Sequence, residues 1–189
     1  MTLERAPCVA LVLACAGCVG IPADTRSLAA GFAREDFTLY GACRSSWSDD
    51  GVLTLKDGPG ALVIALAEPD YRVHVEADVE PGGNSGVFVR SKGGIWFPDG
   101  VEVQIDPADP VNPTGSLYGR ARSRAPIPPA GTWFTIDIDA RGSRVAAAID
   151  GVPSASIDDA PADGPLFGLQ AHYPGSVVRF RGLVIEPVR

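Results

Sequence analysis

Basic residues, histidine and cysteine are scarce in this sequence. Lysine and arginine together number 16 against 23 aspartates and glutamates, which gives a formal net charge of −7. We find no row of basic residues that would neutralise a run of phosphates, so nucleic acid is not expected as a partner. The two histidines, His74 and His172, are too few for a histidine-rich metal site.

The four cysteines exclude a disulfide framework within the folded domain. Three of them lie in the first 18 residues, and only Cys43 lies further along the chain. A single cysteine forms neither an internal disulfide nor a cysteine-based zinc site. We therefore expect Cys43 to be a small buried residue.

The N-terminal apolar run is too short to span a bilayer. Arg5 gives the start of the chain a weak positive charge, and the apolar run "CVALVLACA" follows at residues 8–16. This order is typical of a secretory signal peptide. We predict a signal peptide over residues 1–17 and a tether over residues 18–35, ahead of the folded domain.

Cys18 follows two small residues in "LACAGCVG", a pattern that resembles the lipobox of bacterial lipoproteins. In a lipobox the cysteine is acylated, so Cys18 is the expected lipidation site, and Cys15 is a poorer alternative. The predicted location is the cell envelope, with the lipid anchor as the only membrane contact. Secretion without a lipid is the alternative.

Short apolar runs separated by turn residues make up the rest of the chain. The 22 glycines and 17 prolines stand singly or in pairs between these runs. About ten or more short strands are expected, without an amphipathic helix of useful length. The sequence therefore predicts an all-β sandwich or jelly roll over residues 36–189. The clearest strands are expected at residues 37–41, 60–66, 70–80, 85–91, 101–106, 133–141, 144–150, 166–173 and 177–188.

Three of these strands carry polar residues opposite an apolar face. Side chains alternate along a strand, so the valines of "GVEVQID" place Glu102 and Gln104 on the other side. The same parity places Phe88 and Arg90 opposite Val87 and Val89, and Gln170 and His172 opposite Leu169 and Ala171. We expect these polar groups to meet on one face, although they also fit the ordinary wet face of an antiparallel sheet.

Aromatic residues lie in loops next to the polar strands. Trp96, Phe97 and Tyr118 are the ones concerned, and Tyr118 belongs to a long loop region over residues 107–131. Sugars present a C–H face and a rim of hydroxyl groups, so their sites combine an aromatic platform with amide, carboxylate and guanidinium groups. The pattern favours a carbohydrate site.

Several motifs in order resemble those of the 3-keto-disaccharide hydrolase domain family. They are "GNSGVFVR", "GVEVQI", "NPTGSLYG", "GTWFTIDIDARGSRVAAAIDGV", "GPLFGLQAH" and "VVRFRGLVIEPV". The resemblance covers roughly residues 37–188 and implies a concanavalin or laminin-G-like β-sandwich, a jelly roll of two antiparallel sheets. It marks as site positions Asn84, Ser85, Arg90, Glu102, Gln104, Tyr118, Gln170 and His172.

The chain departs from the family pattern at three places. Gln170-Ala171-His172 stands where members usually read Gln-Asp-His, and Trp133-Phe134 stands where Trp-Asn is common. The usual fuller opening motif is shortened to "FTLYG" at residues 37–41. Ala171 faces the core by parity, so the missing acid affects strand support more than chemistry, but it places activity in question.

The resemblance implies cleavage of a 3-keto-glycoside. The ketone acidifies the hydrogen at C2, the C1 substituent is eliminated from the enolate, and water adds afterwards. His172 or Glu102 is the expected base, and Arg90 is expected at the enolate oxygen. The expected substrate-binding residues are Asn84, Ser85, Gln104, Gln170, Trp96 and Tyr118.

Two further questions stay open at this point. One divalent metal, held through His172 and Glu102, would stabilise the same enolate. A carbohydrate-binding module with the same face and no turnover is the main alternative function, and an envelope interaction domain without a sugar ligand is a third. In the first two cases the partner is a carbohydrate, an oxidised disaccharide or a glycan.

Overall fold

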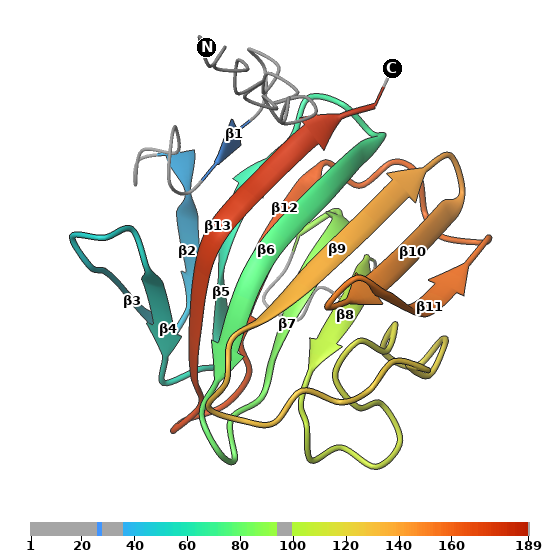
Figure 1. The fold of residues 1–189 in the computed structure, drawn as a ribbon. Coiled ribbons are helices and arrows are strands. Elements are labelled where there is room, and N and C mark those ends of the chain that lie inside the picture. The colour runs from blue at the N-terminus through green and yellow to red at the C-terminus, as the bar shows by residue number, and fades with distance from the viewer. Residues whose placement is uncertain (1–25, 28–35, 94–99, 189) are drawn as a thin grey trace, which may run out of the picture.

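The computed structural model describes residues 26–27, 36–93 and 100–188 of this chain. Its named elements are all β-strands, arranged in two antiparallel sheets (Figure 1). None of the residues described belongs to a helix with the length and apolar character needed to cross a membrane. The predicted signal peptide, with Cys15 and Cys18, lies outside these ranges, so lipidation stays a prediction.

The larger sheet, called sheet A here, has eight strands in the order β11-β10-β9-β6-β13-β4-β3, with β1 paired to β13. The two residues of β1 lie within the predicted tether and extend sheet A beside the end of β13. The strands are β1 (Arg26–Ser27), β3 (Arg44–Trp47), β4 (Leu53–Lys56), β6 (Tyr71–Val79), β9 (Phe134–Arg141), β10 (Arg144–Ile149), β11 (Val152–Ile157) and β13 (Val177–Pro187).

The smaller sheet, called sheet B, has five strands in the order β2-β5-β12-β7-β8 and lies behind sheet A in Figure 1. Its strands are β2 (Thr38–Gly41), β5 (Gly60–Ala65), β7 (Ser85–Ser91), β8 (Val101–Ile105) and β12 (Leu166–Ala171). The predicted all-β sandwich of two antiparallel sheets is therefore confirmed.

The core lies between the two sheets and follows the alternation of the strands. On β6, Val73 and Val75 are buried while Arg72 and His74 between them are exposed. Val87, Val103 and Leu169 meet the core from sheet B, as their parity predicts. Cys43 is also buried, as expected. Burying one face of each sheet supplies most of the favourable free energy of folding.

Ion pairs across the outer face of sheet A fix the register of its central strands. The outer side chains of β6 are basic in the first half of the strand and acidic in the second half. The basic half lies beside aspartates of β9, and the acidic half lies beside arginines of β13. A shift of a strand along its neighbour would break these pairs or bring like charges together. The four pairs are Arg72–Asp139 and His74–Asp137 with β9, and Glu76–Arg181 and Asp78–Arg179 with β13.

Arg90 does not point to the outer face of sheet B, which corrects the expectation from strand parity. The pairing of β7 with β12 shifts by one residue near its end, so that Val89 and Arg90 lie opposite Phe167. Arg90 has a positive φ of 56° at this bulge. A bulge re-aims the side chain that it carries, and here the side chain is fully buried.

The guanidinium of Arg90 joins the two sheets at one end of the sandwich. It forms an ion pair with Asp70 at 3.1 Å, just before β6, and donates to the carbonyl oxygen of Gly142 in the β9–β10 turn. Its backbone N–H also donates to the hydroxyl of Tyr71 at 3.1 Å. Breaking a buried, hydrogen-bonded charge is costly because its partners lose their hydrogen bonds.

We therefore predict that Arg90→Met destabilises the protein by roughly 3 kcal/mol. At about 2–4 °C per kcal/mol this lowers the thermal midpoint by roughly 10 °C, measurable by thermal or denaturant unfolding. Arg44→Met is the matched control, because Arg44 pairs with Asp57 at 3.6 Å on an exposed surface and should cost less than about 1 kcal/mol. An Arg90 variant that keeps its thermal midpoint and loses only activity would contradict this structural role.

Candidate functional site

The outer face of sheet B carries two adjacent rows of polar residues across β12, β7 and β8. In one row Gln170, Gly86 and Gln104 lie side by side, because Leu169 pairs with Val87 and Gly86 pairs with Gln104. Two residues further along each strand, the same antiparallel pairing places His172, Asn84 and Asp106 side by side in a second row. Two hydrogen bonds confirm this row, from His172 N–H to the Asn84 carbonyl at 3.1 Å and from Asn84 Nδ2 to Asp106 Oδ2 at 2.8 Å.

Glu102 reaches these rows because Gly86 has no side chain. Its backbone pairs with Phe88, one step further along the sheet. Its carboxyl group nevertheless lies over Gly86, since a Cβ atom built there would be only 2.3 Å from Glu102 Oε1. Any other residue at position 86 would push the carboxyl group away from Gln170 and Asn84.

The Glu102 carboxyl group is held in its neutral form at neutral pH. Burial raises its pKa to about 8, because a charged carboxylate loses its hydration there. With its amide nitrogen turned toward the carboxyl group, Gln104 donates to Glu102 Oε1 at 3.1 Å and to the Ser85 carbonyl at 3.2 Å. A carboxylic acid that is protonated near pH 7 is able to deliver a proton to a leaving group.

Four buried polar atoms on this face have no hydrogen-bond partner among the described residues. They are Gln170 Oε1, His172 Nδ1, Asn84 Oδ1 and Thr114 Oγ1. Buried polar atoms are nearly always satisfied in folded proteins, so a cluster of unsatisfied ones indicates a place for a polar ligand or water.

Asp106 was not among the predicted site residues, although strand parity places it on the same face as Glu102 and Gln104, and Tyr118 was the predicted residue of the segment 114–118. Asp106 holds the amide nitrogen of Asn84, which leaves the Asn84 oxygen turned to the rows. Leu117 forms a bridge with Val103, and Tyr118 N–H donates to the Glu102 carbonyl at 2.9 Å. The segment 114–118 thus adds a short extended piece to sheet B beside β8. The sequence signal for Asp106 was the alternation of side chains, which continues past the end of β8.

The predicted site residues divide into three groups. Asn84, Glu102, Gln104, Gln170 and His172 lie together on the two rows, and Tyr118 is half exposed beside Glu102. Arg90 and Ser85 lie elsewhere. Trp96 is outside the described residues.

Ser85 is buried on the core side of β7, and its hydroxyl donates to the Gln170 carbonyl at 2.6 Å. It therefore supports β12 and does not face a substrate, which corrects its predicted role. Phe88 faces outward as parity predicts, but it is buried in a small apolar cluster with Ala61 and Val63.

Metal binding stays a prediction. The described part of the chain contains no group of three or more His, Cys, Asp or Glu side chains placed to hold a metal ion. His172 and Glu102 are the two metal-ligating side chains that the site itself offers, and Asp106 is engaged with Asn84 and two backbone N–H groups.

Several solved structures with the same fold are named as glycosyl hydrolases or carbohydrate-binding proteins. A proposed glycosyl hydrolase from Parabacteroides distasonis ATCC 8503 has a TM-score of 0.71 and 22% identity, covering 87% of this chain and 99% of that chain. The carbohydrate binding module CBM66 from Bacillus subtilis has a TM-score of 0.57 and 16% identity, over 80% and 95% of the two chains. The Bacillus licheniformis beta-glucanase has a TM-score of 0.56 and 12% identity, over 86% and 97%. At these identities the likeness establishes the jelly-roll fold.

Sequence comparison gives the family. No curated protein matches the chain. The profile of the 3-keto-alpha-glucoside-1,2-lyase-like domain matches residues 29–186, which is most of the chain and includes every residue of the two polar rows. This chain therefore belongs to the 3-keto-alpha-glucoside-1,2-lyase-like domain family.

Proposed function

We propose that the polar face of sheet B cleaves a 3-keto-glycoside by elimination. The observation that carries this proposal is the position of the Glu102 carboxyl group over Gly86, where burial raises its pKa to about 8, beside the row that holds His172 Nδ1, which has no partner among the described residues. An acid and a base with different protonation states on one face are what elimination and leaving-group protonation require.

The reaction proceeds in two proton transfers. The His172 imidazole removes the C2 proton of the keto sugar, and the electrons of that bond form the enolate between C2 and C3. Those electrons then return to form the C1–C2 double bond as the C1–oxygen bond breaks. Glu102 gives its proton to the departing oxygen, and the products are an unsaturated keto sugar and a free alcohol. Water then adds to the double bond to give the free keto sugar.

The amides on the rows bind the sugar in this scheme. The Gln170 side-chain amide N–H replaces Arg90 as the donor to the C3 oxygen, because the Arg90 guanidinium is engaged with Asp70 and Gly142. Asn84 Oδ1, held in place by Asp106, accepts a hydrogen bond from a sugar hydroxyl. Tyr118 is half exposed beside Glu102 and supplies the aromatic surface for the sugar ring.

The departure from the family pattern at Ala171 does not remove a group from this face. Ala171 is fully buried and belongs to the core between the sheets. The missing acid therefore changes the support of β12, while Glu102 and His172 remain. A non-catalytic carbohydrate-binding module is the second candidate, and the exposed Tyr118 beside hydrogen-bonding amides favours it equally.

Glu102→Gln should lower the rate of 3-keto-trehalose cleavage about 10²–10⁴-fold, because the amide cannot deliver a proton to the leaving oxygen. The assay follows release of glucose and includes unoxidised trehalose, with and without added divalent metal. Glu186→Gln, on the outer face of β13, is the matched control and should retain full activity. If the wild-type protein binds a glycan but cleaves neither sugar, the binding-module function replaces the enzyme.

His172→Ala should lower the same rate to a similar extent while leaving the thermal midpoint nearly unchanged, since its imidazole Nδ1 makes no hydrogen bond with the described residues. Imidazole added to the reaction should restore part of the lost rate if His172 acts as the base. Loss of folding together with activity would contradict this assignment.

The raised pKa of Glu102 also predicts a dependence of stability on pH. The folded protein holds the Glu102 proton up to a pKa of about 8, whereas the unfolded chain loses it near the ordinary value of 4.5. Ionisation of Glu102 therefore destabilises the folded state increasingly from about pH 4.5 to pH 8. Glu102→Gln removes this cost, so its thermal midpoint should match the wild-type value at pH 4 and exceed it at pH 9. Equal midpoints at both pH values would show that the carboxyl group has an ordinary pKa.

A further inference from the structure

We propose that a second surface of the protein, at the β10–β11 hairpin on the side of sheet A, binds an oligosaccharide that bears carboxylate or sulfate groups. This surface is separate from the polar rows of sheet B, and the proposal does not depend on the cleavage reaction. It consists of two adjoining grooves, one lined by three arginines and one in which three carboxylates stand beside one arginine and one histidine.

The basic groove has a volume of about 460 Å³ and is lined by three arginines. Arg122 and Arg124 come from the segment after Tyr118, and Arg144 begins β10. Ser123 and Ser156 add hydroxyl groups to the same lining. Within the described ranges no aspartate or glutamate lines this groove. The protein has a net charge of −7, so this local excess of positive charge is unlike the chain as a whole.

The three guanidinium groups are poorly neutralised by the protein. Arg124 is exposed, and its side chain has no hydrogen bond or ion pair with other residues that the structure describes. Arg122 donates to two carbonyl oxygens, those of Pro110 and Val111. Its charge is offset only in part by the Asp109 carboxylate, whose pKa is lowered by backbone hydrogen bonds and, to a smaller extent, by Arg122. Among the described residues, Arg144 is the one of the three that forms an ion pair, with Asp158 at 2.6 Å.

The Arg144–Asp158 pair does not prevent anion binding. Both side chains are more than half exposed, 54% for Arg144 and 77% for Asp158, and exposed pairs contribute little to stability. A ligand anion that contacts Arg144 and Arg124 together would gain a charge-assisted hydrogen bond from Arg124, which makes none with the described protein, and a second one from the exposed Arg144. Guanidinium groups bind carboxylate and sulfate through two parallel N–H donors.

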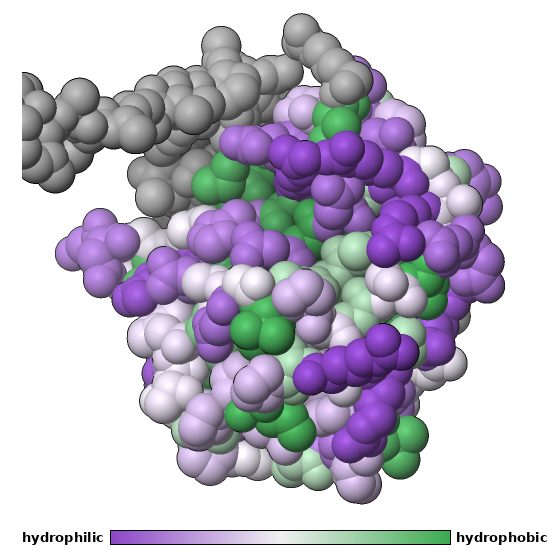
Figure 2. Space-filling view, turned by 45° about the vertical axis from the view of Figure 1, so that its right-hand side comes forward, coloured by the Kyte–Doolittle hydropathy of each residue, from purple (hydrophilic) through white to green (hydrophobic). Residues whose placement is uncertain are grey.

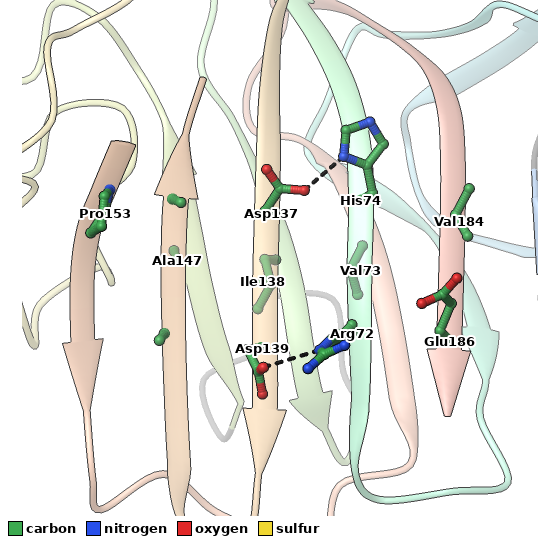
Figure 3. Close-up of a pocket in the computed structure, with 12 residues that line it drawn as sticks. Arg72, Val73, His74, Asp137, Ile138, Asp139, Ala147, Pro153, Val184 and Glu186 are labelled. Atoms are coloured by element: carbon green, nitrogen blue, oxygen red, sulfur yellow. Dashed lines mark hydrogen bonds and ion pairs between the residues drawn. The ribbon is translucent and has the colours of Figure 1, made fainter. Parts of the chain in front are cut away.

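A second groove of about 580 Å³ continues from the first across the outer face of sheet A (Figure 3). The two grooves share Ala146, Ala147 and Pro153, so they adjoin at the hairpin. Alanines of β10 form part of the floor of this groove, and their small side chains leave it deep. Figure 3 shows the His74–Asp137 and Arg72–Asp139 pairs along the groove. Figure 2 faces this side and shows strongly hydrophilic clusters separated by smaller apolar patches.

The second groove fits the uncharged part of a sugar chain. Across β11, β10, β9, β6 and β13 it extends over four strand spacings, about 19 Å in all, which accommodates several sugar units. Asp139 forms an ion pair with Arg72, and Asp137 is hydrogen-bonded to His74. Glu186 has no ion pair among the described residues and repels an anion at the far end of the groove. The ligand is therefore oriented with its acidic group at the arginines.

Nucleic acid fits this surface less well than an acidic glycan. No aromatic side chain lines either groove among the described residues, so bases would have no stacking platform. Three arginines on a protein of net charge −7 neutralise only a short piece of a phosphate backbone.

Calorimetric titration of the purified protein tests the proposal with four probes: an oligosaccharide that carries a single uronate at one end, its carboxyl-reduced neutral counterpart, the same oligosaccharide with one terminal sulfate in place of the uronate, and inorganic sulfate. The acidic oligosaccharides should bind at least about tenfold more tightly than the neutral one, which corresponds to one charge-assisted contact. Binding should weaken as salt increases. The carboxylate and sulfated probes distinguish the two possible sources of the anionic group.

Arg124→Gln and Arg144→Gln should each weaken acidic-glycan binding about five- to tenfold, while Arg44→Gln, which removes the same charge from β3, should leave it unchanged. Arg124→Gln should also leave cleavage of the keto sugar unchanged, so the two proposals fail separately. Equal binding of the acidic and neutral sugars, equal loss with Arg44→Gln, or inorganic sulfate binding as tightly as the glycans would overturn the proposal. Tighter binding of single-stranded DNA than of any glycan would also overturn it.

Discussion

The pairing of β7 between β12 and β8 is the constraint on which both the core and the polar rows depend. A strand has only two faces, so the register that buries Val87 and Val103 also brings Gly86 beside Gln104 and Gln170. A shift of one residue would expose the valines and bury the amides at the same time. The free energy of burying the apolar face therefore holds the strands of the polar face in register, and hydrogen bonds such as Asn84 to Asp106 then orient single side chains on it.

That arrangement is possible because of one missing side chain. Glu102 occupies the space above Gly86, where the carboxyl group is withdrawn from water and keeps its proton up to a pKa of about 8. The cost of that withdrawal is met by the packed strands beneath it. The glycine thus acts through geometry, since it determines where a titratable group lies and thereby which protonation state it has.

Strand parity predicted most of the fold and the centre of the site, because both follow from the period of two. Glu102, Gln104, Gln170 and His172 lie on one face as expected. Parity could not predict the direction of the Arg90 side chain, because a bulge near the end of β7 turns this side chain into the protein. It also gave no sign of the basic groove, because Arg122 and Arg144 are 22 positions apart in the sequence and meet only through the folding of the long segment after β8.

The polar groups on the outer faces of the two sheets have different partners, and the two proposed binding surfaces are therefore expected to bind ligands differently. On sheet A the charged side chains of β6 pair with neighbours, so their main effect is on register. On sheet B several polar atoms, such as Gln170 Oε1 and His172 Nδ1, are buried and have no hydrogen-bond partner among the described residues. A hydrogen bond from a ligand to such an atom is strong, because the surroundings have a low dielectric constant. Strong, directional binding of a small part of a ligand is expected on sheet B. The solvated grooves beside sheet A are suited instead to weaker contacts spread along a longer chain, where arginines at one end add a salt-dependent attraction.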